Sequence, residues 1–186
     1  MTNNQTKTAK QDGQTENNHT DRHAASAGRS ARSGDSPIVT ELKHAYEMEL
    51  ETVINYLANS VHLDGILAQE IRESLKNDIS EELGHATQVA ERLKILNSDV
   101  PGSLSINFDQ KKIQPPADST DVLSVIKGVI EAEKAAIAQY EKIIELADEA
   151  DDYVTEDMCI QILGQEQHHL REFEGFLKSR ERIPLK

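Results

Sequence analysis

Apolar residues recur every three to four positions in four long stretches of this chain, separated by turn residues and by one proline-containing segment. That period predicts amphipathic helices rather than strands. Ser36-Pro37 indicates the N-cap and first position of a helix, Asp64-Gly65 a turn, and Asp118-Ser119-Thr120 another helix start. The predicted fold class is all-α, a four-helix bundle with helices over about 37–64, 66–96, 120–147 and 152–180.

The connections predict how these helices pair. Short turns near Gly65 and over 148–152 predict two antiparallel hairpins. Residues 97–119 contain Pro101, Gly102 and Pro115-Pro116 and are expected to be extended. About 22 extended residues at about 3.3 Å each can run the length of a bundle, so the second and third helices are expected to be parallel and joined by one long crossover.

The two ends of the chain lie outside this pattern. Residues 1–36 contain no Val, Ile, Leu, Phe or Tyr and are expected to form a disordered polar tail with a charge of about +1. Residues 37–182 form the predicted bundle, and residues 183–186 are a short C-terminal end, too short for a fifth helix.

Glutamates and histidines interrupt the apolar faces at a regular spacing. Glu-x-x-His, which places both side chains on one helix face, occurs four times: Glu16/His19, Glu41/His44, Glu82/His85 and Glu166/His169. Only the last two have a glutamate 33 residues upstream, Glu49 and Glu133. We therefore interpret Glu16/His19 as part of the tail and Glu41/His44 as a surface pair.

One constant offset of 84 residues relates the two selected sets. It connects Glu49 to Glu133, Glu82 to Glu166, His85 to His169 and also Tyr56 to Tyr140. The midpoint between the two glutamates of each set falls on a predicted hairpin turn, so the carboxylates of each hairpin should be level. The sequence thus predicts two half-sites that together make one dinuclear metal site.

The residue types suggest the chemistry of that site. Four carboxylates buried among Leu and Ile would be costly unless cations accompanied them. Two divalent ions would neutralise four glutamates, and oxygen and nitrogen donors without thiolate suit iron, with Mn or Zn as alternatives. The alternative interpretation is that these glutamates form buried ion pairs, or that they lie on a polar helix face that does not point to the core.

Neighbouring residues receive weaker assignments. Tyr56 and Tyr140 are expected either to be core aromatics or to hydrogen-bond the metal-binding carboxylates. His168 is expected at the surface, with a supporting role at the site left open, and Cys159 in the core. Glu47 and Glu51 should point to solvent because they lie about 200° around the helix from Glu49.

Composition narrows the class of protein. The net charge of -13 disfavours nucleic-acid and membrane binding by the bundle, although the tail leaves DNA binding open. A single cysteine excludes an internal disulfide and a four-cysteine metal site, and favours a cytoplasmic location. We find no predicted membrane span or signal peptide.

The run from Tyr153 to Leu163, leading into Glu166-Gln167-His168-His169, resembles the fourth helix of a bacterioferritin. With the 33-residue spacings it makes residues Ile38 to Arg182 similar to the ferritin-like superfamily, closest to bacterioferritins and bacterioferritin-like mini-ferritins. The resemblance implies a ferroxidase centre with two iron ions per subunit, which oxidises Fe(II) with O2 or H2O2 for storage or detoxification. It implies terminal ligands Glu49 and Glu133, bridging ligands Glu82 and Glu166, and nitrogen ligands His85 and His169.

Two departures from the family qualify this expectation. Leu83 occupies the position of the methionine that binds haem in bacterioferritins, so no haem is predicted. Without a fifth helix, a homo-oligomeric shell of 12 subunits is favoured over one of 24. A rubrerythrin-like peroxidase, a manganese catalase and a DNA-protecting mini-ferritin remain the alternatives.

Overall fold

The structure, a computed structural model, describes residues 34–182 and confirms the all-α class. Four long helices are present: α1 (Pro37–His62), α2 (Gln69–Ile95), α3 (Val122–Glu149) and α4 (Tyr153–Glu181), with a single 3-10 turn, η1 (Ile66–Ala68), leading into α2. Residues 1–33 and 183–186, which include almost all of the predicted tail and the short C-terminal end, lie outside the described residues.

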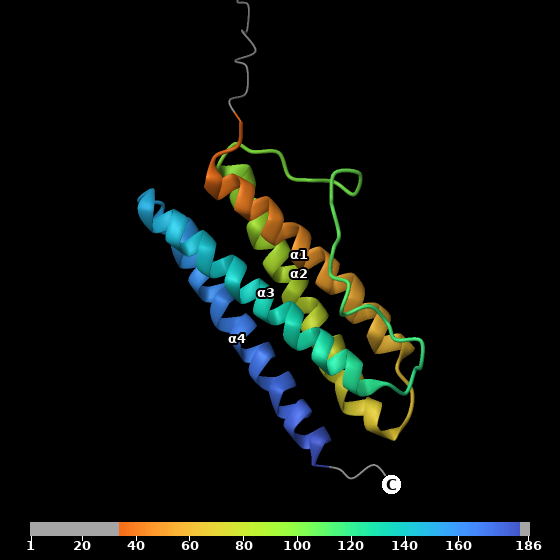
Figure 1. Ribbon diagram of the computed structural model, residues 1–186. Coiled ribbons are helices and arrows are strands. Elements are labelled where there is room, and N and C mark those ends of the chain that lie inside the picture. Colours follow the sequence, from red (N-terminus) through yellow and green to blue (C-terminus); the bar gives the residue numbers. More distant parts are fainter. Residues whose placement is uncertain (1–33, 183–186) are drawn as a thin grey trace, which may run out of the picture. The chain divides into compact units, whose positions relative to one another are not determined.

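The topology follows the predicted hairpins (Figure 1). α1 packs against α2 and α3 against α4, and each pair is antiparallel. The segment between α2 and α3, the crossover (residues 96–121), runs along α1 from one end of the bundle to the other, so α2 and α3 are parallel. α1 also packs against α3, which brings the two hairpins together.

Polar side chains cap the N-termini of α1, α3 and α4. The Ser36 side chain accepts a hydrogen bond from the amide of Val39, with Pro37 as the first helical residue. The third helix, expected from about Thr120, begins two residues later at Val122. Asp118 accepts from the amide of Thr120 and closes a turn, and Asp121 caps α3 by accepting from Ser124. Two neighbouring aspartates compete for one cap here, which the sequence pattern does not resolve.

The apolar core consists of two clusters separated by a polar layer. One cluster includes Tyr56, Leu75, Val129 and Phe173, and the other includes Leu42, Val89, Ile143 and Ile162. Along every helix, the glutamates and histidines singled out in the sequence lie between the residues of these two clusters. The polar layer is therefore held near the middle of the bundle, with apolar packing on both sides.

Hydrogen bonds and close packing fasten the crossover to α1 and α3. Glu51 accepts from the backbone amides of Asp109 and Gln110, each at 2.8 Å, and the Asn59 side chain donates to the Ile113 carbonyl at 2.7 Å. The expectation that Glu51 points to solvent is wrong, because the crossover covers this side of α1 and leaves Glu51 only 6% exposed. On α3 the backbone of residues 112–113 approaches so closely that a Cβ at Gly128 would lie 2.6 Å from the Lys112 carbonyl oxygen.

Several large apolar side chains stay exposed. Leu57 is 55% exposed, because its neighbour Tyr56 takes the inward position and Leu57 lies about 100° further around α1. Ile54 and Val61 are exposed on the same face of α1 as Leu57. Within residues 34–182, no helix combines the length and the apolar character that crossing a membrane requires.

Candidate di-metal centre

The structure brings all six predicted site residues together. Each helix contributes from its buried face: α1 supplies Glu49, α2 Glu82 and His85, α3 Glu133, and α4 Glu166 and His169. All six side chains are buried, the most exposed being His169 at 5%. The three-residue spacing within α2 and α4 sets each glutamate and histidine one turn apart on the same face.

The first group of candidate ligands surrounds His85. Its Nδ1 lies 2.8 Å from Glu166 Oε1, 3.4 Å from Glu82 Oε2 and 3.8 Å from Glu49 Oε2. One ligand atom from each of these four residues lies within 4.8 Å of the others. A single cation could therefore contact all four.

The second group surrounds His169 and repeats this arrangement. His169 Nδ1 lies 3.1 Å from Glu82 Oε1 and 3.9 Å from Glu133 Oε2, and Glu166 completes a set whose ligand atoms are again within 4.8 Å of one another. Glu82 and Glu166 belong to both groups, and the two imidazole centroids are 6.3 Å apart. The two sets therefore define adjacent positions with shared carboxylates, as a dinuclear centre requires.

Unpaired polar atoms in the site support a cation-binding role. Glu82 Oε1, both Glu166 oxygens and the Nδ1 atoms of both histidines are buried and form no hydrogen bond; four of the five meet only in the imidazole–carboxylate contacts given above, and Glu166 Oε2 has none of these contacts. Buried polar atoms are nearly always hydrogen-bonded in folded proteins, so a group of five that are not needs an explanation. Carboxylate oxygens and imidazole nitrogens are good ligands for divalent transition metals, and the residues fit two such ions.

The ionisation of the site reflects its burial and crowding. Burial, followed by the charges of Glu82 and Glu166, raises the pKa of Glu49 and of Glu133 well above the ordinary value. Burial opposes ionisation of Glu82 as well, but the adjacent imidazoles of His169 and His85 lower its pKa to about 2. The pKa of His169 rises to about 9, because Glu82 outweighs the effect of burial. In the metal-free fold, protons on the site therefore take the place of cations.

Two tyrosines hold the outer carboxylates across the bundle. Tyr56 of α1 donates its hydroxyl hydrogen to Glu133 of α3, and Tyr140 of α3 donates to Glu49 of α1. Burial and the adjacent carboxylate raise the pKa of both phenols well above the ordinary value, which keeps them protonated donors. Each hairpin thus orients the carboxylate that the other hairpin supplies.

A second reciprocal pair of contacts, which the sequence analysis missed, holds the imidazoles. His169 Nε2 lies 3.2 Å from Glu81 Oε2, and His85 Nε2 lies 3.0 Å from Gln165 Oε1. Glu81 and Gln165 are themselves related by the 84-residue offset, each directly preceding a glutamate of the site. The offset was therefore a signal that could have identified them, although they differ in residue type.

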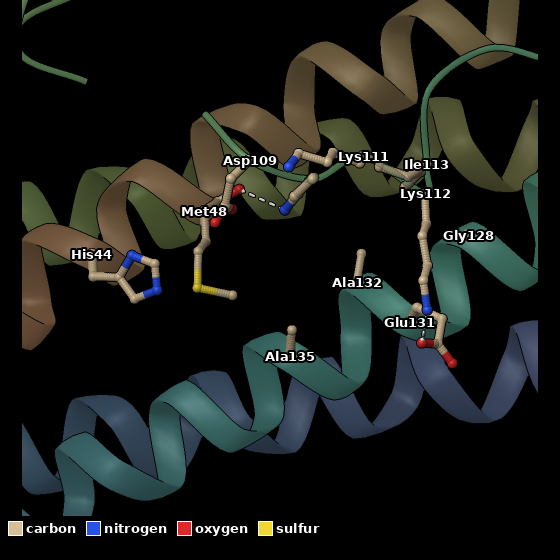
Figure 2. Close-up of a pocket in the computed structure, with 11 residues that line it drawn as sticks. His44, Met48, Asp109, Lys111, Lys112, Ile113, Gly128, Glu131, Ala132 and Ala135 are labelled. Atoms are coloured by element: carbon tan, nitrogen blue, oxygen red, sulfur yellow. Dashed lines mark hydrogen bonds and ion pairs between the residues drawn. The ribbon is translucent and has the colours of Figure 1, made fainter. Parts of the chain in front are cut away.

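The remaining candidates lie elsewhere. Glu41 pairs with Lys142 at 2.8 Å, and His44 lines a hollow of about 470 Å³ between α1, α3 and the crossover. Figure 2 shows this hollow, with His44 and Met48 on one side and Ala132 and Ala135 on the other; none of the six site residues lines it. His168 is exposed, and Glu16 and His19 lie outside the described residues.

Comparisons with known proteins agree with the fold and identify the family. A family model described as a ferritin-like domain matches residues 39–183, so the chain belongs to the ferritin-like family. It is 26% identical to a bacterioferritin of Desulfovibrio desulfuricans over 138 residues, which are 74% of this chain and 73% of that protein. A solved structure of a ferritin-like, diiron-carboxylate protein from Bacillus anthracis str. Ames has the same fold, with a TM-score of 0.67 and 24% identity over 75% of this chain and 94% of its own.

Proposed function

We propose that this protein is a ferroxidase of the bacterioferritin type, which oxidises Fe(II) to Fe(III) with O2 or H2O2 and so stores or detoxifies iron. The proposal depends on the pair of buried ligand groups that share Glu82 and Glu166, in which five candidate ligand atoms form no hydrogen bond. A ferritin-like family match and a bacterioferritin relative support the same class of chemistry.

The donor set defines how the site would hold its substrate. Each Fe(II) position offers one outer carboxylate, Glu49 or Glu133, one imidazole Nδ1, and oxygens of the two shared carboxylates. Four ionised glutamates balance two divalent ions, so the filled site would carry no net charge. Iron bound there would supply the electrons that reduce the oxidant, and Mn(II) or Zn(II) fit the same donors.

Surrounding residues prepare the imidazoles for this role. A hydrogen on His169 Nε2 can be donated to Glu81, and one on His85 Nε2 to Gln165. This assignment leaves the Nδ1 lone pair of each ring facing into the site, ready to bind a cation. Tyr56 and Tyr140 donate hydrogen bonds to Glu133 and Glu49 and so restrain the orientation of these two carboxylates.

Replacing the two shared carboxylates together tests the proposal. The double variant Glu82→Ala/Glu166→Ala should oxidise Fe(II) more than about 100-fold more slowly, as followed by stopped-flow absorbance in air. About 100-fold is the upper range for losing a residue that only hydrogen-bonds a metal ligand, and loss of two ligands should cost more. The control replaces Glu91 and Asp157, exposed carboxylates on the same two helices, and should oxidise iron normally. An unchanged rate in the first variant would refute a ferroxidase at this site.

Iron uptake distinguishes storage from a redox enzyme without storage. Two Fe(II) per chain should be oxidised quickly, and uptake should continue well beyond that ratio if the protein stores mineral. Uptake that stops at two per chain would instead favour a di-metal enzyme such as a peroxidase or a manganese catalase.

We further propose that the chains assemble into a homo-oligomeric shell in the cytoplasm. The exposed face of α1 formed by Ile54, Leu57 and Val61 supports association, because such side chains gain from burial. A light-scattering mass near 12 copies of the 20.7 kDa chain is expected, and a mass near 24 copies would contradict that size.

With Leu83 at the position of the haem ligand, the purified protein should show no Soret absorption band.

A further inference from the structure

The two halves of the candidate di-metal centre are equivalent in their ligands but not in what lies outside the imidazoles. His169 Nε2 lies 3.2 Å from a carboxylate oxygen of Glu81, whereas His85 Nε2 lies 3.0 Å from the amide oxygen of Gln165. Both partners are exposed, and each directly precedes a glutamate of the site. The 84-residue offset relates them, so one imidazole has a charged partner where the other has a neutral one.

The wider surroundings of the two imidazoles differ in the same direction. Outside His169 lies a second hollow, of about 550 Å³, which opens between α2 and α4. The charged residues that line it, besides Glu81, are Asp78, Glu172 and Arg171. The offset assigns three uncharged residues to the corresponding positions around His85: Ile162, Gln88 and Thr87. Three carboxylates against one guanidinium therefore surround one imidazole, and the matching positions around the other carry no charge.

A carboxylate and an amide act differently on an imidazole that binds a metal. An imidazole that donates its Nε2 hydrogen to a carboxylate is more basic at Nδ1 than one that donates to a neutral amide, and it binds a cation more tightly. Nearby carboxylates also attract the cation directly. The Glu81 side chain is 52% exposed, and water screens its charge, so the effect should lie near the lower end of the about 10- to 100-fold range of such partners.

We propose that the two metal positions differ in affinity and that the position beside His169 and Glu133 binds the first divalent cation. Glu81 is the positioning residue that sets this order, because it orients His169 and raises the basicity of Nδ1, although it belongs to neither group of candidate ligands. The position beside His85 then fills second. This inference rests on the di-metal site of the proposed function but not on the oxidation of iron there.

Anaerobic loading with Co(II) tests this order without any oxidation chemistry. Repulsion between two bound cations separates the stepwise binding constants of any dinuclear site, so those constants alone do not decide. The deciding measurement is where Co(II) lies at half an ion per chain, read from anomalous X-ray scattering of crystals of the full chain. An affinity ratio of about 10 should place more than about four-fifths of the bound Co(II) beside His169 rather than beside His85.

Exchanging the two partners should reverse the order. In Glu81→Gln/Gln165→Glu the carboxylate lies beside His85, so most of the Co(II) should be found there, and Glu81→Gln alone should lose most of the preference. The control Glu73→Gln removes another exposed carboxylate of α2, which does not line the hollow, and should keep the preference of the unmodified protein. All three replaced side chains are exposed, so the core stays intact in each variant. A residue that only maintained the fold would not move the ion from one position to the other.

The outcomes separate this inference from the proposed function. Equal occupancy in the unmodified protein, or a preference for the side of His85, would overturn the order and leave the di-metal centre standing. An exchange variant that still loads beside His169 would show that Glu81 does not set the order, which refutes the inference. Co(II) bound only away from the six site residues would overturn the di-metal centre itself, and with it the proposed function.

Discussion

Helices α1 and α3 present the same residue types to the candidate di-metal centre but different residues to the rest of the molecule. Under the 84-residue offset, Glu49 corresponds to Glu133 and Tyr56 to Tyr140, and all four side chains are at most 2% exposed. Two positions after Glu49 and Glu133, the two helices no longer carry the same residue type. Glu51 corresponds to Ala135, an exposed residue at the rim of a hollow.

The difference follows from what covers each helix. The crossover lies along α1, where Glu51 accepts two of its amides and Asn59 donates to one of its carbonyls. The counterpart of Asn59 is Ile143, which is buried in the apolar cluster with Ile162. The two helices therefore agree in sequence where they enclose one shared site, and differ where only one of them must satisfy a connecting segment.

Removing metal should have the largest effect on this arrangement, because ions in the shared site join the two hairpins. Free metal at about 1,000 times its Kd would stabilise the fold by about 4 kcal/mol. For a chain of this size that raises Tm by about 8–16 °C. Calorimetry with Mn(II) and then with excess EDTA checks the shift, and an identical Tm in both conditions would mean that the site holds no metal.

The metal-free and metal-loaded forms should respond to pH in opposite directions. The pKa of His169 is about 9 in the metal-free fold against 6.5 ordinarily, so its stabilising contribution is complete below pH 6.5 and is lost as pH rises toward 9. The raised pKa values of Glu49 and Glu133 act in the same direction. Metal binding needs deprotonated ligands and should strengthen over this range. Parallel Tm curves for the two forms would refute this explanation.

The two tyrosines provide a test of equivalence between the halves. Tyr56→Phe and Tyr140→Phe each remove one hydroxyl that donates to an outer carboxylate, and each should slow Fe(II) oxidation by about 10- to 100-fold. Tyr46→Phe, at a half-buried tyrosine outside the site, is the control. A loss confined to one site tyrosine would show that the half-sites are not equivalent in function.

Replacing Glu51, where the two halves differ, should reduce the free energy of unfolding rather than the rate of iron oxidation. Glu51→Gln weakens the contacts to the amides of Asp109 and Gln110, which should cost about 1–2 kcal/mol in urea unfolding. Glu47→Gln, one turn earlier on α1 and only partly buried, should cost less than about 0.5 kcal/mol. Equal effects of the two changes would mean that the crossover is not anchored through Glu51.

The smallest effect is expected at Cys159. Its counterpart under the offset is Leu75, and both side chains are fully buried in apolar clusters. Burial raises the pKa of the Cys159 thiol to about 12, which makes it unreactive at neutral pH. Cys159→Val should change stability by less than about 1.5 kcal/mol and leave iron oxidation unchanged. A slower oxidation rate in this variant would reveal a role for the thiol.

The sequence predicted much of this structure because helical period and residue spacing act along single helices. Those two patterns account for the four helices and for the parallel α2 and α3. They also account for the way Glu49 and Glu133 meet the two Glu-x-x-His pairs. The contacts of Glu51 were not predictable, because the path of the crossover has no period.

Anomalous X-ray scattering from crystals loaded anaerobically with Fe(II) would locate the bound ions. We expect two strong iron peaks per chain, one beside His85 and Glu49 and the other beside His169 and Glu133, with Glu82 and Glu166 between them. A single peak, or peaks away from these six residues, would contradict a dinuclear centre built from two equivalent halves.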